Sequence, residues 1–173
     1  MDIVRTLAGG DRRSIGRARE VVSYIQGRRD ALGDLIAALK HEDATVRMRA
    51  ADVAEKISVQ HPDWFQTYAG RLLALAETTE QQEIRWHMAQ MFPRLKLAPP
   101  RRRRAVAALF KYLDDRSRIV QVSAITALVD LSLEEPALRR RVTPLVLRAA
   151  RSEAPSVRAR AKKLLARLSQ APH

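Results

Sequence analysis

Apolar residues recur along the chain with a helical period, and one thirteen-residue stretch of this pattern occurs four times. The copies are T-V-R-M-R-A-A-D-V-A-E-K-I ending at Ile57, E-I-R-W-H-M-A-Q-M-F-P-R-L ending at Leu95, I-V-Q-V-S-A-I-T-A-L-V-D-L ending at Leu131, and S-V-R-A-R-A-K-K-L-L-A-R-L ending at Leu168. Position 1 is Val46, Ile84, Val120 and Val157. Positions 1, 5, 8, 9 and 12 are apolar in almost every copy. These spacings share one helix face, so the pattern predicts four amphipathic helices.

The copies are separated by 38, 36 and 37 residues. A repeat length in this range is typical of stacked helical hairpins, which predicts an all-α superhelix. We expect one domain over residues 1–173, with an irregular amino-terminal helical cap over 1–28 and hairpins over 29–60, 61–98, 99–135 and 136–169. In the cap, Ser14 is expected to begin the second helix. Pro93 lies within the second copy, where it either kinks the helix or is a tolerated irregularity near the helix end.

The repeated helices resemble those of HEAT repeats, in which an acidic turn residue precedes Val-Arg and then small residues. The first copy has Asp43, Val46, Arg47, Ala50 and Ala51 in this pattern, and the pairs Ile84-Arg85 and Val157-Arg158 repeat its centre. The third copy departs from it with Gln121. The resemblance is to small bacterial HEAT-repeat proteins. It implies a right-handed α-solenoid with the second helix of each hairpin on the concave side.

Composition adds a strong positive charge to this picture. The chain has 32 Lys and Arg against 19 Asp and Glu, a formal net charge of +13. Such a charge suits nucleic acid, an acidic protein or an anionic surface as a partner. There is no cysteine, the amino-terminus lacks a secretory signal, and no apolar run has the length of a membrane span. We therefore expect a cytoplasmic protein that is not embedded in a membrane.

Positions 4, 7 and 11 of the copies are polar and share one face of each helix. If the stack follows the HEAT arrangement, these twelve residues, called here the groove residues, line a concave surface about 40 Å long that can hold a helix, a peptide or one turn of duplex DNA. They are Arg49, Asp52, Lys56, His87, Gln90, Arg94, Ser123, Thr126, Asp130, Arg160, Lys163 and Arg167.

Two arginine runs begin the first helices of the third and fourth hairpins. These seven residues, called here the basic edge, are Arg101, Arg102, Arg103, Arg104, Arg139, Arg140 and Arg141. Arg102 and Arg139 are 37 residues apart, one repeat length, so the runs are expected to be neighbours, joined by Arg94 and Lys96. Clustered guanidinium groups bind carboxylate or phosphate. The alternative is a solvated rim that Glu134 and Glu135 partly neutralise.

The arginine at position 2 recurs as Arg47, Arg85 and Arg158. Its place near each helix start favours a structural role over ligand contact. We expect it to bond turn carboxylates such as Asp43 and to link neighbouring repeats, which makes these four residues a structural ladder.

The sequence has no metal-ligand spacing, glycine-rich phosphate loop or nucleophile elbow. We therefore predict a protein that is not an enzyme and that uses neither metal nor cofactor. One catalytic alternative rests on fold analogy with HEAT-like DNA glycosylases, in which Trp86, Asp52 and Asp130 would supply the aromatic residue and the carboxylate.

The favoured function is a scaffold that binds a protein through the groove residues and the basic edge. A protein partner is preferred because acidic residues interrupt the groove, with Asp130 at its centre. The alternative is sequence-independent binding of DNA or RNA through phosphate contacts.

Overall fold

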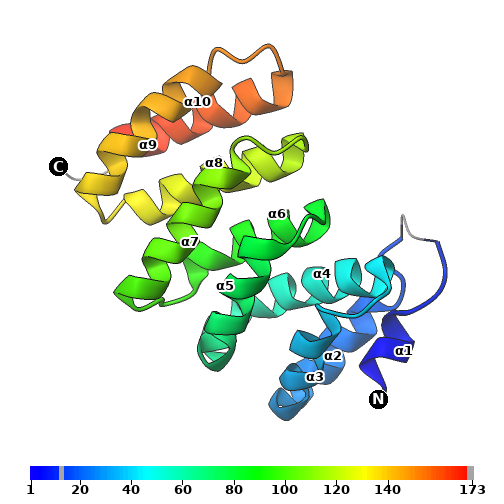
Figure 1. The fold of residues 1–173 in the computed structure, drawn as a ribbon. Helices are drawn as coiled ribbons and strands as arrows, with labels where there is room; N and C mark the ends of the chain where they lie inside the picture. Colours follow the sequence, from blue (N-terminus) through cyan, green and yellow to red (C-terminus); the bar gives the residue numbers. More distant parts are fainter. Residues whose placement is uncertain (12–13, 171–173) are drawn as a thin grey trace.

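The structure is a computed structural model that describes residues 1–11 and 14–170. Within these residues it contains ten α-helices, three short 3-10 segments and no strand. The helices follow one another through an elongated stack, and the two termini lie at opposite ends (Figure 1). The predicted all-α superhelical fold is confirmed.

The chain alternates between two layers of helices. The cap consists of α1 (Ile3–Leu7) and α2 (Ala18–Gly27). The first helices of the hairpins form the outer layer: α3 (Leu32–Ala38), α5 (Ala69–Thr78), α7 (Pro99–Tyr112) and α9 (Pro136–Ala149). The second helices form the inner layer: α4 (Ala44–Gln60), α6 (Gln82–Met91), α8 (Arg118–Ser132) and α10 (Pro155–Ser169). The 3-10 segments are Arg29–Ala31, Pro62–Tyr68 and Phe92–Arg94.

One continuous apolar core runs between the layers. The position 1 residues Val46, Ile84 and Val120 are at most 1% exposed, and burial of such a side chain contributes about 1.5–3 kcal/mol. In the inner layer α4 packs on α6, α6 on α8, and α8 on α10. Small core residues such as Ala50 and Ala124, both fully buried, let these helices approach closely.

The Ser14 prediction was wrong, and for Pro93 the structure shows an irregularity near the helix end. Ser14 does not cap α2, which begins at Ala18, because Gly16 has a φ of +53° and breaks the helical path just before it. The Ser14 hydroxyl accepts a hydrogen bond from the Gly16 amide at 3.0 Å instead. Pro93 does not kink a continuous helix either, because α6 ends at Met91 and the chain continues in a 3-10 turn.

Candidate functional site

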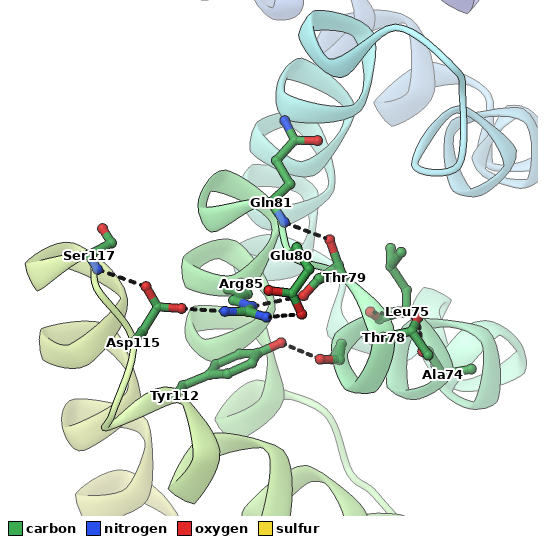
Figure 2. Close-up of polar contacts among 11 residues, drawn as sticks. Ala74, Leu75, Thr78, Thr79, Glu80, Gln81, Arg85, Tyr112, Asp115 and Ser117 are labelled. Carbon is green, nitrogen blue, oxygen red and sulfur yellow. Dashed lines mark hydrogen bonds and ion pairs between the residues drawn. The ribbon is translucent and has the colours of Figure 1, made fainter.

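The position 2 arginines are part of the scaffold. The Arg85 guanidinium donates to the carbonyl of Thr79 at 2.8 Å and to Oδ2 of Asp115 at 2.6 Å (Figure 2). The Asp115 side chain is 6% exposed, and its other oxygen accepts from the Ser117 amide at 2.7 Å. Arg85 thereby links the turn before α6 to the turn between α7 and α8.

The same bond recurs at each copy, with the side chain reaching the carbonyl six residues earlier. Arg47 donates to His41, Arg158 to Ser152 and Gln121 to Asp115, at 2.6–2.7 Å. Gln121 thus replaces arginine without loss of this bond.

The expected contact between Asp43 and Arg47 was wrong. Asp43 precedes α4, and its Oδ1 accepts from the Thr45 amide at 2.7 Å, so it caps the helix. This backbone hydrogen bond lowers the pKa of the Asp43 carboxyl below its ordinary value. Arg47 instead reaches the next repeat through Oε1 of Gln81 at 2.8 Å.

Arg49 was predicted to face a ligand, and this is wrong because the side chain is 1% exposed. Its guanidinium donates to four backbone carbonyls of the segment between α1 and α2, at distances of 2.5–3.1 Å. The acceptors are Leu7, Gly9, Asp11 and Ser14. Arg49 is therefore a buried clamp on the amino-terminal cap.

Two other groove residues are also nearly inaccessible. His87 and Ser123 are each 8% exposed. Burial lowers the pKa of His87 below its ordinary value, although the nearby carboxylates of Asp52 and Glu55 act in the opposite direction. Neither residue is available as a principal ligand contact.

Most cations on the groove side of the inner layer are paired with carboxylates. Lys56 donates a hydrogen bond to Asp52 at 2.5 Å within α4, and Arg167 of α10 forms an ion pair with Asp130 of α8 at 2.6 Å. Arg94 bonds Glu55 at 2.7 Å, 39 residues away, and also Oγ of Ser58 at 3.0 Å.

The sequence prediction missed Glu55 and Ser58. The ion pair between Asp130 and Arg167 could have been predicted from the sequence, because the two residues have opposite charges at position 11 of consecutive copies.

The structure brings six groove residues together around a cavity of about 240 Å³ between α6, α8 and α10. They are Gln90, Arg94, Ser123, Thr126, Asp130 and Arg160. Arg160 and Lys163 of α10 are exposed and form no ion pair or hydrogen bond with any residue that the structure describes. They are the free cations of the predicted groove.

Much of the basic edge holds the stack together. Arg102 donates to the Leu131 carbonyl at 2.6 Å, and Arg139 bonds the carbonyls of Ser132 and Leu133. Both arginines, one repeat apart, therefore meet at the carboxyl end of α8, where free carbonyls attract cations.

Some basic-edge side chains are paired with carboxylates, and others have no bonded partner among the described residues. Arg102 also pairs with Glu135 at 3.1 Å, and Arg104 pairs with Glu77 through two bonds of 2.7 and 2.8 Å. Arg94 does not join the edge, because Glu55 holds it on the groove side. The Arg141 guanidinium lies over the Phe110 ring. Arg101, Arg103 and Arg140 are exposed and have no bonded partner among the described residues.

Positive charge is concentrated in the carboxy-terminal half. Residues 99–173 contain 17 Lys and Arg against six Asp and Glu, whereas residues 1–98 contain 15 against 13. Helices α9 and α10 contain nine Lys and Arg and no acidic residue. Any long-range attraction for an anionic partner therefore originates mainly from the third and fourth hairpins.

The residues of the glycosylase alternative are split between two cavities. Trp86 and Asp52 line a cavity of about 720 Å³ near the cap, while Asp130 lines the smaller cavity at α8. No group of three or more His, Cys, Asp or Glu among residues 1–11 and 14–170 is arranged to hold a metal ion. None of the described helices has the length and apolarity needed to cross a membrane.

No family model matches the chain, and no curated protein does. Solved structures do. An engineered protein, target OR329 of the Northeast Structural Genomics Consortium, has 18% identity and a TM-score of 0.68 over 98% of this chain and 78% of its own. A second, target OR366, has 19% identity and a TM-score of 0.67 over 96% and 79%.

The complex of CpcE and CpcF of phycocyanin lyase from Nostoc sp. PCC7120 is similar as well. Its matching chain has 17% identity and a TM-score of 0.69, over 94% of this chain and 95% of that one. At these identities the likeness is one of fold, so the comparisons show an all-helical repeat architecture of the kind found in these proteins.

Proposed function

We propose that this chain is a non-catalytic helical-repeat scaffold, HEAT-like as its sequence pattern suggests, that binds an acidic segment of a protein partner. The binding surface is the carboxy-terminal part of the groove, where α8 and α10 border the cavity of about 240 Å³. The observation that carries the proposal is the pair of unpaired cations on α10, Arg160, which lines the cavity, and Lys163, one helical turn further along. The central carboxylate of Asp130 is already neutralised by Arg167 at 2.6 Å.

The pattern of ion pairs favours protein over nucleic acid. Phosphate tracking uses a line of Lys and Arg side chains that replace the counterions condensed on the nucleic acid. On the groove side Lys56, Arg94 and Arg167 are each occupied by a carboxylate, which leaves free cations only at the α10 end. The CpcE and CpcF proteins form a complex with each other, and this supports a protein partner for the shared fold.

The test is fluorescence anisotropy with a labelled 20-residue peptide rich in Glu and Leu. The double variant R160E/K163E is compared with R19E/K40E, which makes the same charge change at exposed positions of α2 and the end of α3. We expect at least about a tenfold loss of affinity for R160E/K163E and less than about a threefold loss for the control, as for close against distant interface charges. Equal losses in the two variants would refute the assignment of the site.

A second candidate function is sequence-independent binding of DNA or RNA, which the excess of 17 cations over six acids in residues 99–173 favours. It is tested with a random 20-base-pair duplex and a random RNA strand across a salt series. A fall of several units in log affinity per log unit of salt would establish multiple phosphate contacts and replace the protein-partner proposal. Absence of binding at low salt would remove this candidate.

A further inference from the structure

The outer layer contains a second groove, which lies between α7 and α9. It has a volume of about 560 Å³ and is apart from the cavity of the inner layer. It stays open because α7 packs on α5 and α8, while α9 packs mainly on α8 and α10. The outer helices of the last two hairpins therefore leave a gap that side chains from both line.

The floor of this outer groove is apolar. Val106, Ala107 and Phe110 contribute one face of α7, and Leu138 contributes from α9. Leu138 is 2% exposed, whereas Val106 and Phe110 are half-buried. Half-buried aliphatic and aromatic side chains lining a concave surface are typical of sites that accept an apolar side chain.

The rim of the groove has a surplus of cations, because Arg102 pairs with its one carboxylate, Glu135, at 3.1 Å and leaves Arg103 and Arg141. Arg103 lies one helical turn before Val106 on the same face of α7, is exposed, and makes no ion pair with a described residue. The guanidinium of Arg141 lies 4.6 Å from the centre of the Phe110 ring. A guanidinium stacked on a ring keeps its N–H donors in its own plane, where a carboxylate can accept two of them.

The arginines at this rim are not explained by the stability of their own helices. Arg103 is the fifth residue of α7, which contains no acidic residue and follows Ala98 without a side-chain cap. Cations near a helix amino-terminus oppose the macrodipole. Arg102, Arg104 and Arg139 offset this through bonds to neighbouring elements, but Arg103 has no such bond.

The combination of an apolar floor and a cationic rim specifies the ligand class. A phosphate chain would use Arg103 and Arg141 and leave Val106 and Phe110 without a function. An acidic amphipathic segment uses both, since its apolar side chains cover the floor and its carboxylates reach the rim. From Arg103 to Phe110 the groove runs for about 10 Å along α7, which matches about two turns of a partner helix.

We propose that the groove between α7 and α9 is a second docking site, which binds a short acidic amphipathic segment of a protein partner with its apolar side chains on Val106, Ala107 and Phe110 and its carboxylates on Arg103 and Arg141. This site goes beyond the proposed function because it lies on the opposite layer and uses none of the groove residues.

The experiment uses the full chain and a 16-residue helical peptide with two leucines flanked by glutamates. Its binding is measured by anisotropy and mapped by amide chemical shifts. The variant R103E/R141E is compared with R101E/R140E, which reverses two exposed arginines of the same helices that do not line the groove. We expect at least about a tenfold loss of affinity for R103E/R141E and less than about a threefold loss for R101E/R140E.

A second peptide keeps the glutamates and replaces both leucines by serine. We expect it to bind the unchanged protein at least about tenfold more weakly, because it cannot cover the apolar floor. Equal binding of the two peptides, equal losses in the two arginine variants, or shifts confined to α8 and α10 would each overturn the proposal. The proposal would also be overturned if a random DNA duplex bound more tightly than the peptide and R103E/R141E abolished that binding, because the two arginines would then form a phosphate site.

The two proposals fail independently in this design. If the inner-groove proposal alone is wrong, R160E/K163E keeps its affinity for acidic peptides while the shifts at α7 and α9 persist. Thermal unfolding followed by circular dichroism shows whether each variant retains its helices. If R103E/R141E is unfolded, the test uses two variants that change only the floor of the groove, V106S and V106L. We expect weaker peptide binding for V106S and unchanged binding for V106L.

Discussion

Arg49 shows how an individual residue acquires a structural role that its charge and spacing conceal. Its spacing puts it on the polar face of α4, yet the segment from Leu7 to Ser14 folds over it and surrounds the guanidinium with carbonyls. A Cβ atom at Gly16 would come within 2.8 Å of the Arg49 Cζ. The absence of a side chain at Gly16 and the fork of five donors on Arg49 therefore fit each other.

The first prediction at this scale concerns the Arg49 clamp. R49M removes the donors to four carbonyls, and of these the Asp11 carbonyl keeps a hydrogen bond from the Ser14 amide at 2.9 Å. We expect a loss of about 3 kcal/mol or more in the free energy of unfolding, because buried acceptors are left unpaired. Denaturant unfolding measures the loss, and hydrogen exchange should locate it in α1 and α2. A loss below about 1 kcal/mol would contradict the role of Arg49.

The second prediction concerns pH. His87 has a folded-state pKa lowered by burial, so the unfolded chain binds its proton more readily. Above the unfolded-state pKa of about 6.5, His87 is neutral in both states and its contribution to the free energy of unfolding is fully present. As pH falls through this value the unfolded chain binds the proton first, and the free energy of unfolding declines. We expect the free energy of unfolding to fall less between pH 7.5 and 5.5 in H87Q than in the unchanged protein. An identical fall in both proteins would show that His87 does not contribute.

At the scale of elements, turns and helix ends are held together by side chains from the next repeat. Arg85 joins the turn before α6 to Asp115, and Tyr112 of α7 donates to the Ala76 carbonyl of α5 at 2.6 Å (Figure 2). Arg102 and Arg139 bond the last carbonyls of α8. The hairpins are therefore coupled by polar contacts at their ends in addition to the apolar core.

The Tyr112 contact makes a direct test of this coupling. Burial raises the pKa of the Tyr112 hydroxyl, which therefore stays protonated as a donor to Ala76. We expect Y112F to lose about 1 kcal/mol of unfolding free energy, the usual net value of such a bond plus an unpaired carbonyl. Y24F is the control, because the Tyr24 hydroxyl contacts only the exposed amino-terminus, at 3.3 Å. Equal effects of the two changes would contradict this account.

A further prediction at this scale separates binding from stability in α7. R103E places an anion just beyond the first turn of α7 and breaks no ion pair, so we expect a gain of at most about 0.3 kcal/mol in unfolding free energy. R104E is its matched neighbour and should lose stability, since it replaces the Arg104–Glu77 pair by two like charges. Thermal unfolding at low salt measures both. A destabilised R103E would indicate a structural role for Arg103.

The whole molecule is electrostatically asymmetric along its length. Helices α9 and α10 contain nine cations and no acid, and they occupy one end of the stack, where packing neighbours lie on one side alone (Figure 1). Repulsion among these charges opposes folding of the last hairpin. We expect amide protection in α9 and α10 to rise between 20 and 300 mM salt, because screening weakens the repulsion.

The internal control for this salt effect is the centre of the stack. Helices α4 and α6 together contain four Lys and Arg against three acids, a nearly balanced set, so their amide protection should change little over the same range. A uniform change along the chain would instead indicate a general salt effect on the core. An acidic partner would have the same local effect as salt, since it binds the folded hairpin.

The sequence by itself determined the repeat fold, because its signal is local. The apolar stripe of each inner helix lies within thirteen residues, and Val46, Ile84 and Val120 are buried as their common position requires. The second helix of the cap was predicted, but its start was not, since the left-handed conformation of Gly16 just before α2 is imposed by the packing around Arg49.

The accessibility of the candidate site was decided only by the tertiary structure. Whether a groove cation is free depends on carboxylates about one repeat away, such as Glu55 for Arg94 and Asp130 for Arg167. Helical spacing places a residue on a face but gives no information on what folds over that face, which is why Arg49 became a clamp while Arg160 stayed free. The outer groove likewise arises from the separation of α7 and α9, which no pattern within either helix contains.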